Sequence, residues 1–569
     1  MKLIKLTSAY KQFTAGLLVL SLAACGSLDL NPLADGSSET WNSNAEEIEM
    51  SLNGLYKDAF WPEDSDEWTD DFIYRDAMTP ITGATITGET DFVKSWWVNT
   101  YKAIARANTV IESVDRAAAK LTPDQINRYK ADARFSRACF YSRLLSHYGN
   151  IIYTEKMLNI EEALALKQID SAIVLKNIYA DFDSAALYLK KTYGANELKR
   201  PSSGAALAMK ARIALQMRDY ATARDAALLC MNQNVYKLHP SFSDLFISKT
   251  KNSQESIFAL PRSIALKVTF GDCQNFVSRN AGGWAAKDPS WDLFCSFLCK
   301  DGLPIDESPL FNPRKPFDNR DPRCAATIVP FGTAHLGFVF EPHPDSLKVL
   351  QTSNNSRVEN KDTRSIAQYA SFNGLLFKKG IDGDWLLNSW QMEADKIIIR
   401  YADVLLMYAE AKIELNEIDQ TVLDAINQVR ARAYGVAYTN VAAYPAVVTT
   451  DPANLRSIVR IERRMEFAQE GTRYADIIRW RIAGKVLNLP NYGMLDPADL
   501  RTKVVAPGLW FFPETPQIDE NGTADFLPMY TAGLIKQVAI RKFDETRQYL
   551  WPIPSTEVLA SGLTQNDNY

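Results

Sequence analysis

The sequence predicts a mainly α-helical protein, a scaffold of paired helices with an inserted loop-rich region that contains short strands. Three observations predict it. Apolar residues recur at helical spacing in the first and last thirds of the chain, and residues 205–231 carry small-residue faces at the same spacing. Between them, residues 237–395 lose this periodicity, and Pro, Gly, Asn and Asp punctuate short segments. The 569 residues are enough to bury a large core.

The chain begins with a targeting segment. A basic start precedes Phe13 to Ala24, an uncharged apolar run of 12 residues. That run has the length of a signal-peptide core and is too short for a transmembrane helix, which takes roughly 20 apolar residues. It ends in Leu22-Ala23-Ala24-Cys25, which resembles a bacterial lipobox. We therefore expect residues 1–24 to be a lipoprotein signal peptide and Cys25 to carry acyl chains such as palmitate. The alternative is a secreted protein that is cut nearby, with Cys25 incidental.

Residues 25–45 are polar and are predicted to be a lipidated linker. Residues 46–236 form the expected N-terminal helical part. Within it, Thr122-Pro123-Asp124-Gln125 is typical of a helix start, with Thr as the cap and Pro in the first turn. That helix is expected to run through Tyr148 and to stop at Gly149.

Residues 205–231 are the clearest local unit. Ala205, Ala208 and Ala211 make one small-residue face, and after a break at 217–220 the spacing continues from Ala223. Small residues let two helices pack closely, and the unit resembles a tetratricopeptide hairpin. Such hairpins need neighbours that bury their faces. The other amphipathic segments can supply them: 45–59, 101–118, 126–148, 177–191, 402–416, 421–433 and 453–470.

Residues 237–395 are expected to be a loop-rich, ligand-binding part, because long loops on a rigid scaffold usually carry function. Residues 396–569 form the expected C-terminal helical part and tail, with a second irregular stretch at 484–550. In this part Glu462, Arg463, Arg464 and Glu466 are predicted to hold helix ends and the loop-rich part together. Trp480 and Trp551 are interpreted as packing residues.

Composition excludes several function classes. The chain has 63 Lys and Arg against 68 Asp and Glu, a net charge of −5, which argues against nucleic-acid binding. Four scattered histidines and no CxxC pair give no metal site, and no cofactor motif is present. Cys139 and Cys230 lie in helical apolar patterns and are expected to be buried thiols.

Seven segments, in order along the chain, carry a resemblance to a known family: 133–138, 321–323, 400–411, 426–433, 461–480, 551–554 and 565–566. Together they resemble the SusD/RagB family of outer-membrane nutrient-binding lipoproteins. The resemblance implies a tetratricopeptide-like scaffold at the outer membrane that faces the cell exterior. It also implies non-catalytic capture of oligosaccharide or polysaccharide and its delivery to a partner TonB-dependent transporter of the SusC-like kind.

Two alternatives stay open. Relatives in this family also take peptides, so the same architecture could capture a peptide. A surface glycoside hydrolase would need two carboxylates at a fixed separation, and the 68 acidic residues do not exclude such a pair by number. No catalytic residue is predicted, because no acidic residue stands in a recognisable catalytic motif.

The candidate ligand residues combine aromatic faces for sugar C–H groups with polar groups for hydroxyls. Trp96 and Asn99 are three apart at a helix start, where the resemblance implies contact with glycan, and Asp71 and Arg75 lie on the loop before it. Trp284 follows two glycines in a loop. Trp385 is the last candidate, next to Asp382 and Asp384, which lack the full pattern of a calcium loop.

Overall fold

The computed structural model describes residues 41–194, 197 and 199–569. The predicted signal peptide and lipidation site, Cys25, and most of the linker lie outside these described residues. No helix in the described part is both long and apolar enough to cross a membrane.

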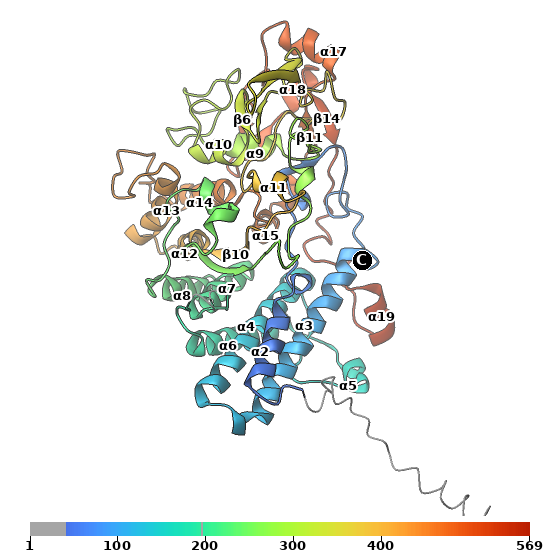
Figure 1. Ribbon diagram of the computed structural model, residues 1–569, viewed down its shortest axis with the longest axis vertical. Coiled ribbons are helices and arrows are strands. Elements are labelled where there is room, and N and C mark those ends of the chain that lie inside the picture. Colours follow the sequence, from blue (N-terminus) through green and yellow to red (C-terminus); the bar gives the residue numbers. More distant parts are fainter. Residues whose placement is uncertain (1–40, 195–196, 198) are drawn as a thin grey trace, which may run out of the picture.

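The scaffold is a series of paired helices, drawn in the lower and middle parts of Figure 1. Each helix packs on the next along the chain, α3 on α4, α4 on α6, α6 on α7 and α7 on α8, and α8 packs on α12 across a long gap in sequence. The predicted tetratricopeptide-like scaffold is confirmed. Its helices are α2 (Ala45–Asn53), α3 (Asp91–Arg116), α4 (Pro123–Tyr148), α6 (Ser171–Tyr188), α7 (Ser203–Gln216), α8 (Tyr220–Met231), α12 (Tyr401–Glu414), α13 (Gln420–Ala433), α14 (Pro452–Phe467) and α15 (Arg473–Arg479).

Local chemistry fixes both ends of α4 as predicted. The Gln125 backbone N–H donates to Thr122 Oγ1 at 3.2 Å, and the Thr122 backbone N–H donates to Gln125 Oε1 at 2.9 Å. This capping box satisfies two donors that a helix start otherwise leaves unpaired. The helix ends at Gly149, whose φ of 73° is a backbone conformation that favours glycine.

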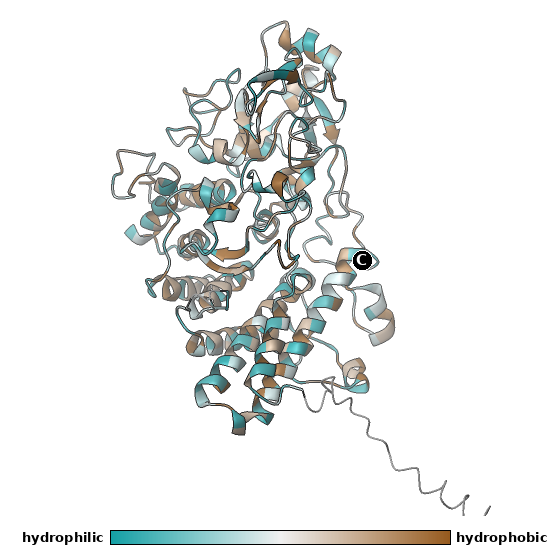
Figure 2. Cartoon of the chain, viewed as in Figure 1, coloured by the Kyte–Doolittle hydropathy of each residue, from teal (hydrophilic) through white to brown (hydrophobic). Residues whose placement is uncertain are grey.

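The α7–α8 pair packs through its small residues, as expected. Ala205, Ala208 and Ala211 are all fully buried, and so are Ala223 and Ala227 on the facing helix. In Figure 2, hydrophilic and hydrophobic residues alternate along the scaffold helices, as expected when each helix has one buried stripe. The predicted buried thiols, Cys139 and Cys230, are 3% and 0% exposed, and the six described cysteines are all unbonded.

A second, loop-rich part lies over the scaffold and fills the upper half of Figure 1. Its largest sheet is the antiparallel meander β6-β7-β8-β9. It has its own hydrophobic core, which draws residues from 273–385 and from 492–535. The predicted short strands are confirmed. The strands are β1 (Phe72–Tyr74), β4 (Ser256–Leu260), β5 (Lys287–Pro289), β6 (Thr333–His335), β7 (Phe338–Phe340), β8 (Lys348–Gln351), β9 (Ser356–Glu359), β10 (Lys396–Arg400), β11 (Asn491–Gly493) and β14 (Lys536–Ala539).

The remaining elements are short. The helices are α5 (Ile160–Ala165), α9 (Trp291–Ser296), α10 (Pro322–Thr327), α11 (Asp384–Leu387), α16 (Ala483–Val486), α17 (Pro497–Leu500), α18 (Leu527–Thr531) and α19 (Ser555–Ser561), and the strands are β2 (Ile151–Ile152), β3 (Gln168–Ile169), β12 (Gln517–Ile518) and β13 (Ala524–Asp525).

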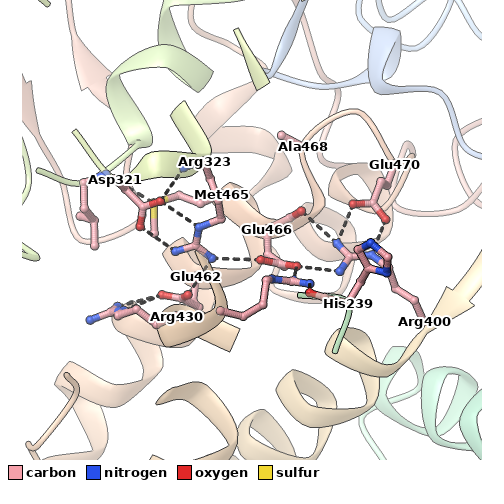
Figure 3. A network of polar contacts seen from close by, with 12 residues as sticks. His239, Asp321, Arg323, Arg400, Arg430, Glu462, Met465, Glu466, Ala468 and Glu470 are labelled. Carbon is pink, nitrogen blue, oxygen red and sulfur yellow. Dashed lines mark hydrogen bonds and ion pairs between the residues drawn. The ribbon is translucent and has the colours of Figure 1, made fainter. Parts of the chain in front are cut away.

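Helix α14 joins the two parts through buried ion pairs (Figure 3). Glu466 is fully buried and lies 2.6 Å from Arg400 Nη1 and 3.1 Å from Arg323 Nη1, and it also pairs with Arg432. Glu462 lies 2.8 Å from Arg323 as well. Because Arg323 lies on α10 of the loop-rich part and Arg400 ends β10, one helix ties both parts together, as the sequence predicted for these charged residues.

Candidate functional site

The Trp284 loop places an indole ring at the surface. The Gly283 backbone N–H donates to Ser278 O at 2.8 Å, and the Trp284 backbone N–H donates to Gln274 O at 2.8 Å, which closes the turn. A Cβ at position 283 would lie 2.2 Å from the Val277 carbonyl oxygen, so only glycine fits there. The tight turn leaves the Trp284 side chain projecting, and the residue is 47% exposed.

Arg75 lies directly beside this tryptophan. Strand β1 pairs with β5, with Tyr74 opposite Lys287, and this pairing brings the residue after β1 next to the Trp284 loop. Arg75 Nη2 donates to the Trp284 carbonyl oxygen at 3.1 Å, and the guanidinium carbon lies 5.3 Å from the centre of the Tyr369 ring. The structure therefore brings together two of the predicted site residues, Arg75 and Trp284.

Three exposed aromatic residues lie near Arg75, and we call them the aromatic ledge. They are Tyr74, Trp284 and Tyr369, which are 36%, 47% and 51% exposed. The Tyr369 ring contacts the Arg75 guanidinium, and the Tyr74 ring centre lies 5.5 Å from Lys287 Nζ. Large aromatic side chains are usually buried, so three exposed ones in one region mark a surface that is available for binding. Ring faces next to guanidinium donors can cover the C–H face of a sugar and bond its hydroxyls.

Two buried acids lie beneath the aromatic ledge. Asp288 and Asp362 are each 2% exposed, and Asp362 Oδ1 accepts from the Arg279 backbone N–H at 2.7 Å, which holds the start of the Trp284 loop. Burial raises the pKa of Asp288 to about 8, although Ser371 and Arg75 act in the opposite direction. Burial likewise raises the pKa of Asp362 to about 6. Neither carboxyl reaches the surface, so their role is structural support.

Trp96 does not lie on a ledge, contrary to prediction. It is 7% exposed, and its ring centre lies 4.9 Å from that of Trp551 and 5.7 Å from that of Trp68. Helix α3 is covered on this side by segments far away in sequence, so both Trp96 and Trp97 are buried. Asn99 remains partly exposed one turn further along α3, without an exposed aromatic partner.

Asp71 is also withdrawn from solvent. It is 2% exposed and lies 2.6 Å from Arg464 Nη2 on α14. Its neighbour Asp70 pairs with the same arginine at 2.8 Å and with Arg473 at 2.8 Å. The expectation that Asp71 offers a hydrogen bond to a ligand is wrong, because Arg464 of α14 occupies its buried carboxylate.

Trp385 is buried as well, with 3% of its surface exposed. It is the second residue of α11 and packs 6.2 Å from the Phe270 ring centre, at the wall of a cavity of about 320 Å³. Trp385 is therefore not part of the exposed surface around Trp284, and its ligand-binding role stays a prediction. Glu63, Asp66, Arg262 and Lys379 also line that cavity.

The sequence interpretation missed three residues of the site. Tyr74 is the residue before Arg75, and its exposure at the end of a strand gave no periodic signal. Tyr369 comes from an irregular stretch and reaches Arg75 only through the fold. Arg279 precedes the glycines of the Trp284 loop, and its Nη1 lies 3.5 Å from the Trp284 carbonyl oxygen. Among the described residues, no group of three or more His, Cys, Asp or Glu gathers as a metal ion would require.

Comparison with known proteins identifies the family of this chain. Residues 254–569 match the family model described as SusD family, and residues 36–215 match one described as starch-binding associating with outer membrane. A curated relative from Formosa agariphila, SusD-like protein P2, is 23% identical over 83% of this chain and 91% of its own length.

Solved structures agree with these matches. A SusD-like carbohydrate binding protein from Bacteroides fragilis is 27% identical, with a TM-score of 0.74 over 91% of this chain and 98% of its own. A laminarin binding SusD-like protein is 20% identical, with a TM-score of 0.60 over 93% of this chain and 100% of its own. The first family model alone covers more than half of the sequence, and the predicted resemblance is confirmed: this chain belongs to the SusD family.

Proposed function

We propose that this protein captures oligosaccharide or polysaccharide at the outer surface of a bacterial cell, without breaking bonds, and delivers it to a partner TonB-dependent transporter. The aromatic ledge carries the proposal. Exposed rings flanking an arginine suit a ligand that has both apolar ring faces and hydroxyls, and a glycan has both. The laminarin-binding and carbohydrate-binding relatives support the same ligand class.

The absence of catalysis is part of the proposal. Glycoside hydrolysis needs two carboxyl groups that reach the glycosidic bond from opposite sides. Two acids of the ledge region, Asp288 and Asp362, are buried and face the protein rather than the surface. This burial favours binding without hydrolysis.

Anchoring by a lipid on Cys25 completes the proposal. An acylated cysteine would hold the protein at the outer membrane, where stable attachment takes more than one acyl chain. Cells grown with labelled palmitate should yield labelled protein, and the Cys25→Ala variant should lose both the label and the membrane fraction. Labelled Cys25→Ala protein would contradict this assignment.

A glycan array followed by product analysis tests the proposed binding. Purified protein is screened against a glycan array, and each bound glycan is then incubated with it and assayed for new reducing ends. Trp284→Ala should weaken binding about fivefold, because stacking of one ring contributes on the order of 1 kcal/mol. Trp41→Ala is the matched control, since Trp41 is also exposed, at 38%, but lies at the start of α2. Release of reducing ends, or equal binding by Trp284→Ala and the parent, would contradict the proposal.

A further inference from the structure

Arg75 and Arg279 have no acidic partner, which sets them apart from the arginines of the buried network. Neither forms an ion pair with any described residue. The guanidinium of each instead donates to one neutral acceptor, the Trp284 carbonyl oxygen, at 3.1 Å from Arg75 Nη2 and 3.5 Å from Arg279 Nη1. Two positive charges thus converge on a single oxygen at the exposed ledge.

This convergence is electrostatically unfavourable unless an anion is added. The two donor nitrogens can be no further apart than these two distances together, and like charges at such a separation repel. A carboxylate or sulfate group has several acceptor oxygens and matches the fork of N–H donors on a guanidinium. An anion bound to both side chains would replace repulsion by two charge-assisted contacts.

Nearby acids do not supply that anion. Asp288 is the acid beneath Arg75, and burial raises its pKa to about 8, so it is mostly uncharged at neutral pH. Asp362 accepts from the backbone N–H of Arg279 rather than from its guanidinium. Asp272 is 2.6 Å from Lys287 and is neutralised there. Asp76, next to Arg75, is exposed and forms no ion pair with a described residue.

We propose that the aromatic ledge selects acidic glycans, with a sugar carboxylate or sulfate held between Arg75 and Arg279 while the ring stacks on Trp284. The inference rests on the proposed function and narrows it from glycans in general to anionic ones. The chain as a whole is acidic, with a net charge of −5, so this local pair of cations, rather than a general attraction, would draw the ligand in.

A glycan array that carries acidic and neutral polysaccharides of matched backbones tests the proposal. Each acidic hit is then neutralised, either by reducing its uronate carboxylates to alcohols or by removing its sulfate esters. The treatment that weakens binding shows which anion is recognised. We expect acidic hits whose affinity falls at least about tenfold on conversion and falls with added salt. Neutral hits that bind as tightly as their acidic counterparts would overturn the inference and leave the proposed function standing. An array without hits would overturn both.

The variants Arg75→Gln and Arg279→Gln test whether these two side chains cause the preference for acidic glycans. Each should weaken binding of the acidic hit about tenfold or more and leave binding of its neutralised form unchanged. Arg116→Gln removes the same charge from an exposed position at the end of α3. It should change neither the binding of the acidic hit nor the binding of its neutralised form. Equal losses for the acidic and neutralised forms would mean that the arginines only support the loop, which overturns the inference. Binding of poly-glutamate that depends on the same arginines would also overturn it, in favour of an acidic peptide.

Discussion

The arginines that surround Glu466 of α14 and those of the aromatic ledge are in opposite situations. In the buried network around α14, Arg323, Arg400 and Arg432 each share the carboxylate of Glu466, and all are at most 7% exposed. At the ledge, Arg75 and Arg279 share one backbone carbonyl and face no carboxylate. Each arginine of this network thus has a carboxylate partner, whereas Arg75 and Arg279 form no ion pair with a described residue.

The contrast separates charges that hold the structure from charges that can bind. A buried charge is tolerated only with partners, so the arginines paired with Glu466 have no capacity left for a ligand. An exposed guanidinium keeps its hydration and can exchange it for an anionic ligand at little cost. Substitutions in the two regions should therefore affect different properties, stability in one and affinity in the other.

The largest expected effect is that of Glu466→Ala. It would leave three arginines buried around one vacated carboxylate, and removing a partner from a buried ion pair costs about 3–5 kcal/mol. Chemical denaturation should show this loss in the free energy of unfolding, or the variant should fail to fold. Stability equal to that of the parent would mean that the network is not what joins the two parts.

Trp96→Ala and Trp284→Ala should behave differently although the substitution is the same. Trp96 is 7% exposed within an aromatic cluster, and truncating a buried tryptophan costs about 3–5 kcal/mol. Trp284 is 47% exposed, so its loss should leave the free energy of unfolding nearly unchanged. Parallel denaturation curves decide this, and a stable Trp96→Ala variant would contradict the observed packing.

pH should act on the two regions in opposite senses. Burial would raise the pKa of Glu466, but Arg432, Arg400 and Arg323 outweigh burial and lower it to about 2. Its contribution to stability is therefore present above its ordinary pKa and is lost as the pH falls toward 2. Asp288 has a raised pKa of about 8, so its protonated form favours folding at low pH, and stability falls as the pH rises from about 4 toward 8.

Asp288→Asn isolates the contribution of Asp288 to the pH dependence of stability. The amide cannot ionise, so the stability of the variant relative to the parent should increase between about pH 4 and pH 8, a window set by the ordinary pKa and by the raised value of about 8. Thermal unfolding at several pH values in that window measures the difference. A difference that is independent of pH would show that Asp288 ionises normally beside Ser371, Arg75 and Asp362.

The smallest expected effect is that of Glu417→Gln. Glu417 lies 2.6 Å from Arg224 at the surface, and its side chain is 43% exposed. Exposed ion pairs contribute about 0–1 kcal/mol, so this variant should be close to the parent in denaturation. It serves as the matched control for Glu466→Ala, and a comparable loss in both would remove the distinction between buried and exposed pairs.

Local patterns account for the parts of the fold that the sequence predicted. The capping box at Thr122 and Gln125 and the alanine faces of α7 and α8 involve residues within a few turns of each other, so their chemistry is readable from the chain. The role of Glu462 and Glu466 followed from charges of both signs close together on one helix, which can pair along its surface or with neighbouring helices. The partners themselves, such as Arg323, could not be assigned without the fold.

The site was predicted less completely because its members meet only through long-range packing. Trp284 could be found from the glycines that precede it. Trp96 was misplaced because helical spacing shows which residues share a face, but not that Trp551, at the other end of the chain, covers this face. Tyr369 carries no local signal and reaches Arg75 across the loop-rich part.

The free energy of unfolding of the parent and of Arg75→Gln, each measured with and without a saturating acidic glycan, tests the central claim most directly. Without ligand the two proteins should be equally stable. With ligand at about 100 times its Kd, the parent should gain about 2.7 kcal/mol, and Arg75→Gln should gain clearly less. Loss of stability in ligand-free Arg75→Gln, together with an undiminished gain on adding glycan, would show that Arg75 holds the structure rather than the ligand.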